Sequence, residues 1–191
     1  MHPSRPEGKK TLAKRFTVLA LSMILVLPLR SPSVTVSATQ TLNAVISPKG
    51  KVSVSPAISL INSGTAFTTY SGAIPVQFYI RTSPGAAGTI TVQATSDFSP
   101  AGGPLVTNGN LTYTCSGPTL GTACSGTQTV SRTLQTPVLN VSSAGGTCTG
   151  GGGACSAAAP NSVSINLSLP NNPALSTGTY SAQLTFTISA M

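Results

Sequence analysis

The sequence holds very few side chains that could perform acid–base chemistry. Its single histidine is His2, its single glutamate is Glu7, and the only other carboxylate side chain is Asp97. General acid–base catalysis draws on a histidine, or on a pair of carboxylates whose pKa values are separated. A Ser/Lys nucleophile through Lys49 or Lys51 is formally open, but both lysines lie in a Ser-Pro-Lys-Gly-Lys stretch that predicts a solvated turn. We therefore expect a protein that is not an enzyme, and we interpret Asp97 as a turn residue.

The four cysteines are the second group of residues that could carry chemistry. Cys115 and Cys124 have the spacing C-x8-C, and Cys148 and Cys155 have the spacing C-x6-C. Zinc sites use closer, recognisable spacings such as C-x2-C, often with histidines, so we expect no metal and no cofactor. An even number of cysteines in an exported chain indicates two disulfides. Three pairings are possible, and we favour Cys115 with Cys124 and Cys148 with Cys155, because each pair flanks a short Gly/Ser/Thr loop.

The first 38 residues have the pattern of an export signal. A basic stretch at residues 5–15 precedes an apolar run at residues 16–29, and that run is shorter than the roughly 20 residues that span a bilayer. Small residues at Val36 and Ala38 predict cleavage after Ala38. The alternative is an uncleaved amphipathic or membrane-anchoring N-terminus. We predict a signal peptide at residues 1–38 and a single domain at residues 39–191, located in the periplasm, at the cell surface or outside the cell.

The charge of the chain is concentrated in the predicted signal peptide. The formal net charge is +8, and six of the ten basic residues precede residue 31. The predicted mature chain retains Lys49, Lys51, Arg81 and Arg132 against Asp97, a net charge of about +3. Four dispersed cations lack the clustering and the stacking aromatics of a nucleic-acid surface, so we expect no nucleic-acid partner. We also expect no membrane span after signal cleavage.

Residues 39–191 alternate apolar and polar side chains with period two, interrupted by Gly, Pro, Ser and Asn turns, and no amphipathic helix is evident. A turn is predicted at residues 47–50, and the turn at residues 84–88 predicts a hairpin of its flanking strands. We expect strands near residues 41–46, 52–54, 58–60, 76–81, 90–94, 111–115, 130–134, 138–141, 163–169 and 180–190, with a weaker segment at residues 66–70. Eight to ten short strands predict an all-β, antiparallel β-sandwich of immunoglobulin-like or jelly-roll type.

The two ends of the predicted mature chain carry a resemblance to a known family. The signal peptide is followed by an alternating segment at residues 39–47, and a Gly-x-Tyr sequence at residue 178 begins a terminal alternating strand. The apolar positions of that strand are Tyr180, Leu184, Phe186 and Ile188. In these features the chain resembles bacterial secreted pilin-like β-sandwich proteins, in particular the spore coat protein U family and chaperone–usher fimbrial subunits. That family has a cysteine soon after its mature N-terminus, whereas the first cysteine here is Cys115.

The resemblance implies a structural surface protein that assembles by β-strand addition. Its N-terminal strand, with Leu42, Ala44 and Ile46 as alternate side chains, would complete the sheet of a neighbouring subunit. The implied partners are further copies or related surface subunits, and a periplasmic chaperone. In one alternative the N-terminal strand pairs within its own sheet. A second alternative is an extracellular adhesive or glycan-binding module that uses the loops at residues 99–109 or 142–160.

Overall fold

The computed structural model describes residues 39–62, 64, 67–142 and 155–191. The predicted signal peptide at residues 1–38 lies outside the described residues. Ala44–Met191 form one compact unit that contains every described strand. Within the described residues, no helix has the length and apolar character needed to cross a membrane.

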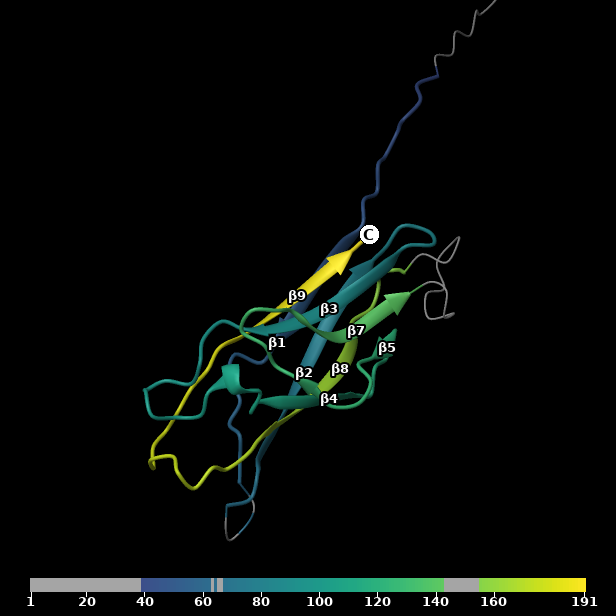
Figure 1. Ribbon diagram of the computed structural model, residues 1–191. Helices are drawn as coiled ribbons and strands as arrows, with labels where there is room; N and C mark the ends of the chain where they lie inside the picture. The colour runs from purple at the N-terminus through teal and green to yellow at the C-terminus, as the bar shows by residue number, and fades with distance from the viewer. Residues whose placement is uncertain (1–38, 63, 65–66, 143–154) are drawn as a thin grey trace, which may run out of the picture. The chain divides into compact units, whose positions relative to one another are not determined.

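Two antiparallel sheets make up this unit, which confirms the predicted all-β sandwich (Figure 1). The five-stranded sheet has the order β1-β2-β8-β4-β6, and the four-stranded sheet has the order β5-β7-β3-β9. Their bounds are β1 Lys49–Val54, β2 Tyr70–Arg81, β3 Ala87–Ala94, β4 Thr112–Ser116, β5 Thr122–Ala123, β6 Gln128–Thr129, β7 Thr136–Ser142, β8 Asn161–Leu169 and β9 Leu184–Ala190. One short 3-10 helix, η1 (Val106–Asn108), precedes β4.

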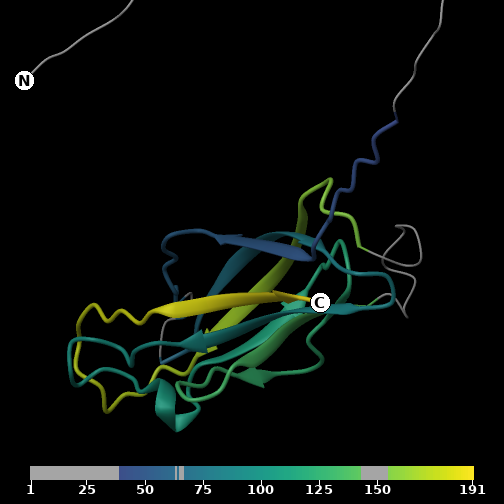
Figure 2. The ribbon, with the colours of Figure 1, turned by 90° about the horizontal axis from the view of Figure 1, so that it is seen from above.

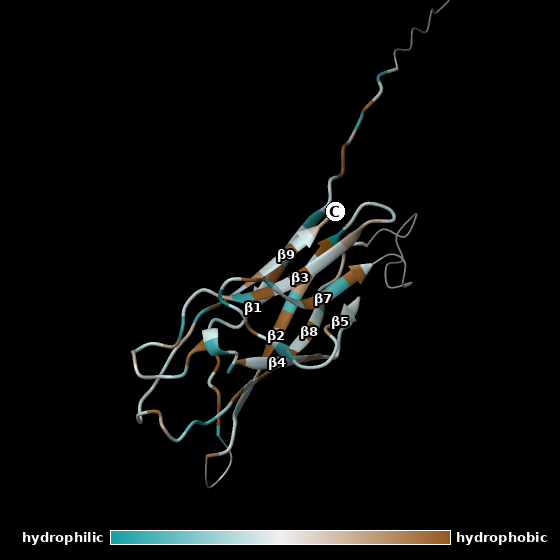
Figure 3. Ribbon diagram, viewed as in Figure 1, coloured by the Kyte–Doolittle hydropathy of each residue, from teal (hydrophilic) through white to brown (hydrophobic). Residues whose placement is uncertain are grey.

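The core lies between the two sheets and is built from the alternating positions of each strand. In β2, Val76, Phe78 and Ile80 are completely buried, and Ile90 and Val92 of β3 are buried in the same cluster. Burial of such a side chain contributes about 1.5–3 kcal/mol. Brown and teal segments follow one another along the strands in Figure 3, as expected when one face of each sheet is buried. Period-two alternation is therefore what fixes the orientation of each strand.

The predicted hairpin of the strands around residue 84 is wrong. β2 pairs with β1 and β8 in one sheet, whereas β3 pairs with β7 and β9 in the other. The connection crosses between the layers because both strands have a strongly apolar face, and these faces pack against each other. Gly88 of β3 lies so close to the side chain of Ile80 that an added Cβ would clash with it.

Several strand ends also differ from the predictions. Residues 39–48 lie in no strand, and Lys49 and Gly50 belong to β1 rather than to a turn. The predicted strand near residues 58–60 is reduced to a single bridge between Ile61 and Ser71. The predicted strand at residues 130–134 is also absent, because β6 ends at Thr129. Alternation marks a segment able to form a strand, but a ladder forms only where a partner lies within hydrogen-bonding distance.

The terminal strand is shorter than predicted at its beginning. β9 starts at Leu184, so Tyr180 lies outside it. The Tyr180 hydroxyl donates a hydrogen bond of 2.9 Å to the carbonyl of Ser176. The same ring packs on Gly103, where an added Cβ would clash with it. Tyr180 therefore fixes the loop before the strand, whereas Leu184, Phe186 and Ile188 lie in β9 as predicted.

Candidate functional site

The outermost strands of the two sheets differ in how well they are protected against pairing with another chain. β5 and β6 are only two residues long, and β1 carries the exposed charged side chains of Lys49 and Lys51. Short length and lysines are devices by which proteins block edge-to-edge association. β9, at the end of the four-stranded sheet, is seven residues long and carries no charged side chain. Among the described edge strands, β9 is therefore the least protected.

The backbone pairing of β9 leaves one set of its polar groups facing outward. The N–H of Thr95 donates to the carbonyl of Gln183 at 2.9 Å, and the N–H of Met191 donates to the carbonyl of Ala87 at 3.1 Å. Residues of an antiparallel pair alternate between bonding to the partner and facing away from it. The odd-numbered residues of β9 therefore bond to β3. The N–H and C=O groups facing the unpaired edge belong to Leu184, Phe186, Ile188 and Ala190.

The side chains of these same four residues are half-buried and pack against the core cluster. Beside them runs β1, the edge strand of the other sheet, as Figures 1 and 2 both show. A Cβ added at Gly50 of β1 would lie 3.0 Å from Cγ1 of Ile188. The two sheets thus approach closely on this side, and glycine at position 50 leaves room for the Ile188 side chain. A strand added to β9 would place its own apolar side chains next to these half-buried positions.

The segment before β1 is unpaired and carries exposed apolar side chains. The exposed fractions are 92% for Leu42, 93% for Val45 and 73% for Ile46, and Ala44 is exposed as well. At its end, Nε of Arg81 donates a hydrogen bond of 3.0 Å to the carbonyl of Ser47. Three large apolar side chains are thus exposed within five positions of the chain. Within the described chain, this segment and the β9 edge each lack a strand partner.

The opposite side of the sandwich is closed by a disulfide. Cys115 in β4 is bonded to Cys124, and the backbone N–H of Cys124 donates to the carbonyl of Val138 in β7 at 2.9 Å. The bond therefore joins the five-stranded sheet to the four-stranded sheet, and it confirms the first predicted pairing.

The second predicted pairing involves Cys148, which lies outside the described residues, so that pairing stays a prediction. Its other member, Cys155, is buried. The backbone of Cys155 exchanges two hydrogen bonds with Thr82: its N–H donates to Thr82 Oγ1 at 3.0 Å, and its carbonyl accepts from the Thr82 N–H at 3.3 Å. Cys155 is thereby fixed against the end of β2.

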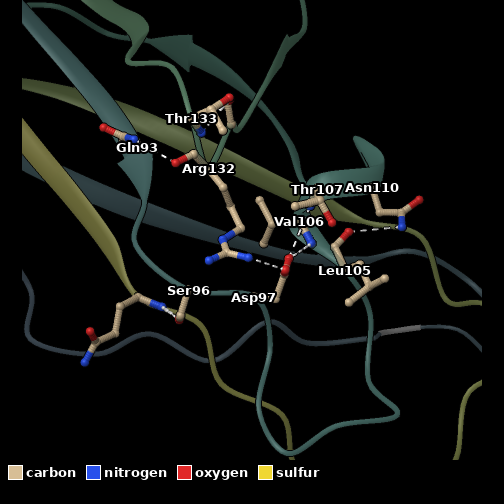
Figure 4. A network of polar contacts seen from close by, with 11 residues as sticks. Gln93, Ser96, Asp97, Leu105, Val106, Thr107, Asn110, Arg132 and Thr133 are labelled. Carbon is tan, nitrogen blue, oxygen red and sulfur yellow. Dashed lines mark hydrogen bonds and ion pairs between the residues drawn. The ribbon is translucent and has the colours of Figure 1, made fainter.

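Asp97 holds together two loops at one end of the sandwich (Figure 4). Its Oδ1 accepts from the backbone N–H groups of Val106 and Thr107, at 2.7 and 3.2 Å, and its Oδ2 accepts from Nη1 of Arg132 at 2.7 Å. Desolvation raises the pKa of Asp97, but the hydrogen bonds from Thr107, Arg132 and Val106 outweigh it and lower that pKa. A carboxylate occupied by these three donors is a loop anchor, which agrees with its interpretation as a turn residue.

The pairing of β1 with β2 brings together three cations that are dispersed in the sequence. Lys49 lies directly opposite Arg81, and Lys51 lies directly opposite Tyr79. The fourth cation of residues 39–191, Arg132, lies elsewhere and is paired with Asp97. No group of three His, Cys, Asp or Glu side chains that could hold a metal occurs among the described residues. The sequence alone did not predict that Lys49, Lys51 and Arg81 lie together, because Arg81 is about 30 positions from the lysines and only the register of β1 with β2 brings them close.

Comparisons with known proteins found no family. No family model matches the sequence. A search of curated proteins also found no match. The function of the chain is therefore inferred from the β9 edge, the segment before β1 and the chemistry of the surface.

Proposed function

We propose that this protein is a secreted structural subunit of a surface fibre, coat or matrix, and that it assembles by β-strand addition. In this assembly, residues 39–47 of one copy add to the outer edge of β9 in the next copy. The observation that carries the proposal is the edge of β9, which is long, uncharged and unpaired in the described chain. Such an edge is a template for pairing unless it is protected.

Strand addition would pair the outward backbone groups of β9 with the segment before β1. The incoming backbone would bond to the N–H and C=O groups of Leu184, Phe186, Ile188 and Ala190, each bond contributing about 0.5–1.5 kcal/mol. Leu42, Ala44 and Ile46 lie on one face of an extended segment, because side chains alternate along a strand. This spacing lets them enter beside the half-buried side chains of β9. Backbone pairing then provides affinity and the alternate side chains provide register.

Two further observations support a non-catalytic role outside the cytoplasm. The Cys115–Cys124 disulfide is the kind of bond that persists in oxidising compartments. The carboxylate of Asp97 is occupied by the Val106 and Thr107 amides and by Arg132, which leaves it no role as a general base.

The first experiment compares residues 39–191 with residues 48–191 by size-exclusion chromatography with light scattering. We expect concentration-dependent multimers for the longer chain and a monomer for the shorter one. A peptide of residues 39–47 should bind the shorter chain, and the same peptide with Leu42→Asp and Ile46→Asp should not. If both chains elute as the same monomer at every concentration, strand-addition assembly is wrong.

The second experiment tests the acceptor edge with a matched pair of charge substitutions. Thr187→Lys places a lysine on the outer face of β9, whereas Thr89→Lys places one on the same face of β3, which is paired on both sides. We expect Thr187→Lys to reduce assembly and Thr89→Lys to leave it unchanged, because only the first charge lies at the pairing edge. Equal loss in both variants would show that net charge, and not the β9 edge, controls association.

A further inference from the structure

Lys49, Lys51 and Arg81 form a surface group that we name the cation cluster. The alternation of β1 and β2 puts their side chains on the outward face of the five-stranded sheet. Successive outward residues of a strand are about 6.8 Å apart, and directly opposite residues are about 5 Å apart, so the three charges share a small area. The single ion pair of the described residues joins Arg132 to Asp97, and it leaves this cluster uncompensated.

The cluster is unfavourable for the fold taken alone. Like charges directly opposite each other on neighbouring strands are destabilising, and Lys49 faces Arg81 in this way. Residues 39–191 contain only four cations, and three of them lie in this cluster. A high content of Lys and Arg therefore does not explain why the three lie so close together. An anion bound across the cluster would remove this repulsion.

Arg81 is oriented for such an anion. Its Nε is held by the carbonyl of Ser47, while its two terminal nitrogens make no hydrogen bond to any described residue. A guanidinium with both terminal nitrogens available can bind a carboxylate through two parallel hydrogen bonds. Arg81 also lines an open hollow of about 310 Å³. The hollow is lined by hydroxyl-bearing residues and by apolar ones, and Lys49 and Lys51 lie outside it. The hydroxyl-bearing residues are Ser47, Thr82, Ser83 and Ser156, and the apolar ones are Ile46, Pro48 and Pro84.

The side chains next to the cluster indicate which class of anion it could bind. Tyr79, opposite Lys51, has 36% of its surface exposed and offers one ring beside the charges. The next row across the sheet is Ser53, Gln77 and Ser162, which carry hydroxyl and amide groups. Electrostatic binding to an anionic bilayer uses clusters of about four to eight cations, and binding to single-stranded nucleic acid uses several stacking aromatics. A hydrophilic face with three cations, one ring and many hydroxyls suits a charged sugar polymer.

We infer that the cation cluster binds an acidic polysaccharide through the carboxylates of its uronic acid residues. Arg81 holds one carboxylate by its terminal nitrogens, and Lys49 and Lys51 neutralise neighbouring ones. This inference uses a different sheet from strand addition and needs no second copy of the chain, but the two share Ser47, which ends the proposed donor segment and orients Arg81.

The expected salt dependence follows from the number of cations. For a flexible polyanion, each neutralised charge contributes about −0.7 to the slope of log K against log salt concentration, so three contacts give a slope of about −2. The dissociation constant should then rise roughly twentyfold between about 50 and about 200 mM NaCl. In the double variant Lys51→Gln/Arg81→Gln, a single contact remains, and the rise should shrink to roughly threefold.

The test measures binding of residues 39–191 to immobilised polygalacturonate by biolayer interferometry, with dextran as the uncharged polymer. The matched control is Arg132→Gln, which removes the same unit of charge as Arg81→Gln but lies outside the cluster. We expect Arg81→Gln to weaken binding and Arg132→Gln to leave both affinity and salt slope near those of the parent. Thermal unfolding of each variant shows that it is folded.

Three results would overturn the inference. The first is no binding to polygalacturonate at about 50 mM salt, where counterion release is most favourable. The second is equal weakening by Arg81→Gln and Arg132→Gln, which would assign the effect to net charge. The third is tighter binding to DNA or to phosphatidylglycerol vesicles than to polygalacturonate, which would assign the cluster to another class of polyanion. If strand-addition assembly fails, all three binding measurements can still be interpreted, because each can be made on the monomer.

Discussion

The disulfide between Cys115 and Cys124 should account for a measurable share of the stability of the fold. The two cysteines are separated by nine positions and link β4 to the residue after β5, across the two sheets. In the chain-entropy description, a cross-link that closes a loop of this length lowers the entropy of the unfolded chain, which stabilises the native state by about 2.6 kcal/mol at 25 °C. The double variant Cys115→Ser/Cys124→Ser should lose that amount.

Urea denaturation measures the loss directly. With a dependence on urea of about 2 kcal/mol per molar, a loss of about 2.6 kcal/mol lowers the midpoint by about 1.3 M. The control is Cys115→Ala/Cys124→Ala, which removes the same cross-link without adding two hydroxyls to half-buried positions. The two variants should have similar midpoints. If the serine variant unfolds at the parent midpoint, or if the alanine variant regains it, the cross-link is not the source of the stability.

Three other substitutions test the packing and the loop anchor. Tyr113→Phe removes a buried hydroxyl that donates to the carbonyl of Pro137 at 2.7 Å, and the unsatisfied carbonyl should lower the free energy of unfolding by about 1–3 kcal/mol in urea titrations. Gly88→Ala should lower the unfolding temperature, through a loss of about 1–3 kcal/mol, because the new methyl group meets Ile80 and the carbonyl of residue 189; an unchanged temperature would contradict the tight contact. Asp97→Asn should destabilise at neutral pH. Because the pKa of Asp97 is lowered in the folded state, its contribution is complete above about pH 4 and disappears as the pH falls through that lowered value, so parent and variant should converge in acid. A difference in urea midpoint that is as large at pH 2 as at pH 7 would contradict this assignment.

Much of the secondary structure followed from the sequence alone. The alternation at residues 76–81, 90–94, 138–141 and 163–169 predicted four strands that the structure contains, because an apolar face must be buried and its period identifies the strand. Spacing also favoured the first disulfide among three possible pairings, since Cys115 and Cys124 flank a short loop. These are local properties, and neighbours in sequence are sufficient to determine them.

The candidate assembly site was predicted only in part. The sequence indicated Leu42, Ala44 and Ile46, together with the terminal strand, as the groups that could pair. It could not show that residues 39–48 have no partner strand, or that the unpaired backbone groups of β9 belong to its half-buried residues. Tyr180 was assigned to the strand by its spacing, yet it serves the preceding loop. An edge is a property of sheet order, and sheet order depends on contacts between distant segments.

The sequence by itself determined that this chain forms strands, has almost no acid–base groups and carries little charge beyond its first 38 residues. Only the tertiary structure decided that β2 and β3 lie in opposite sheets, that β9 ends one of them and that Lys49, Lys51 and Arg81 share one surface. The physical reason is the same in each case. Alternation predicts that one face of a strand is buried. Which other segment covers that face depends on packing and register across the whole chain.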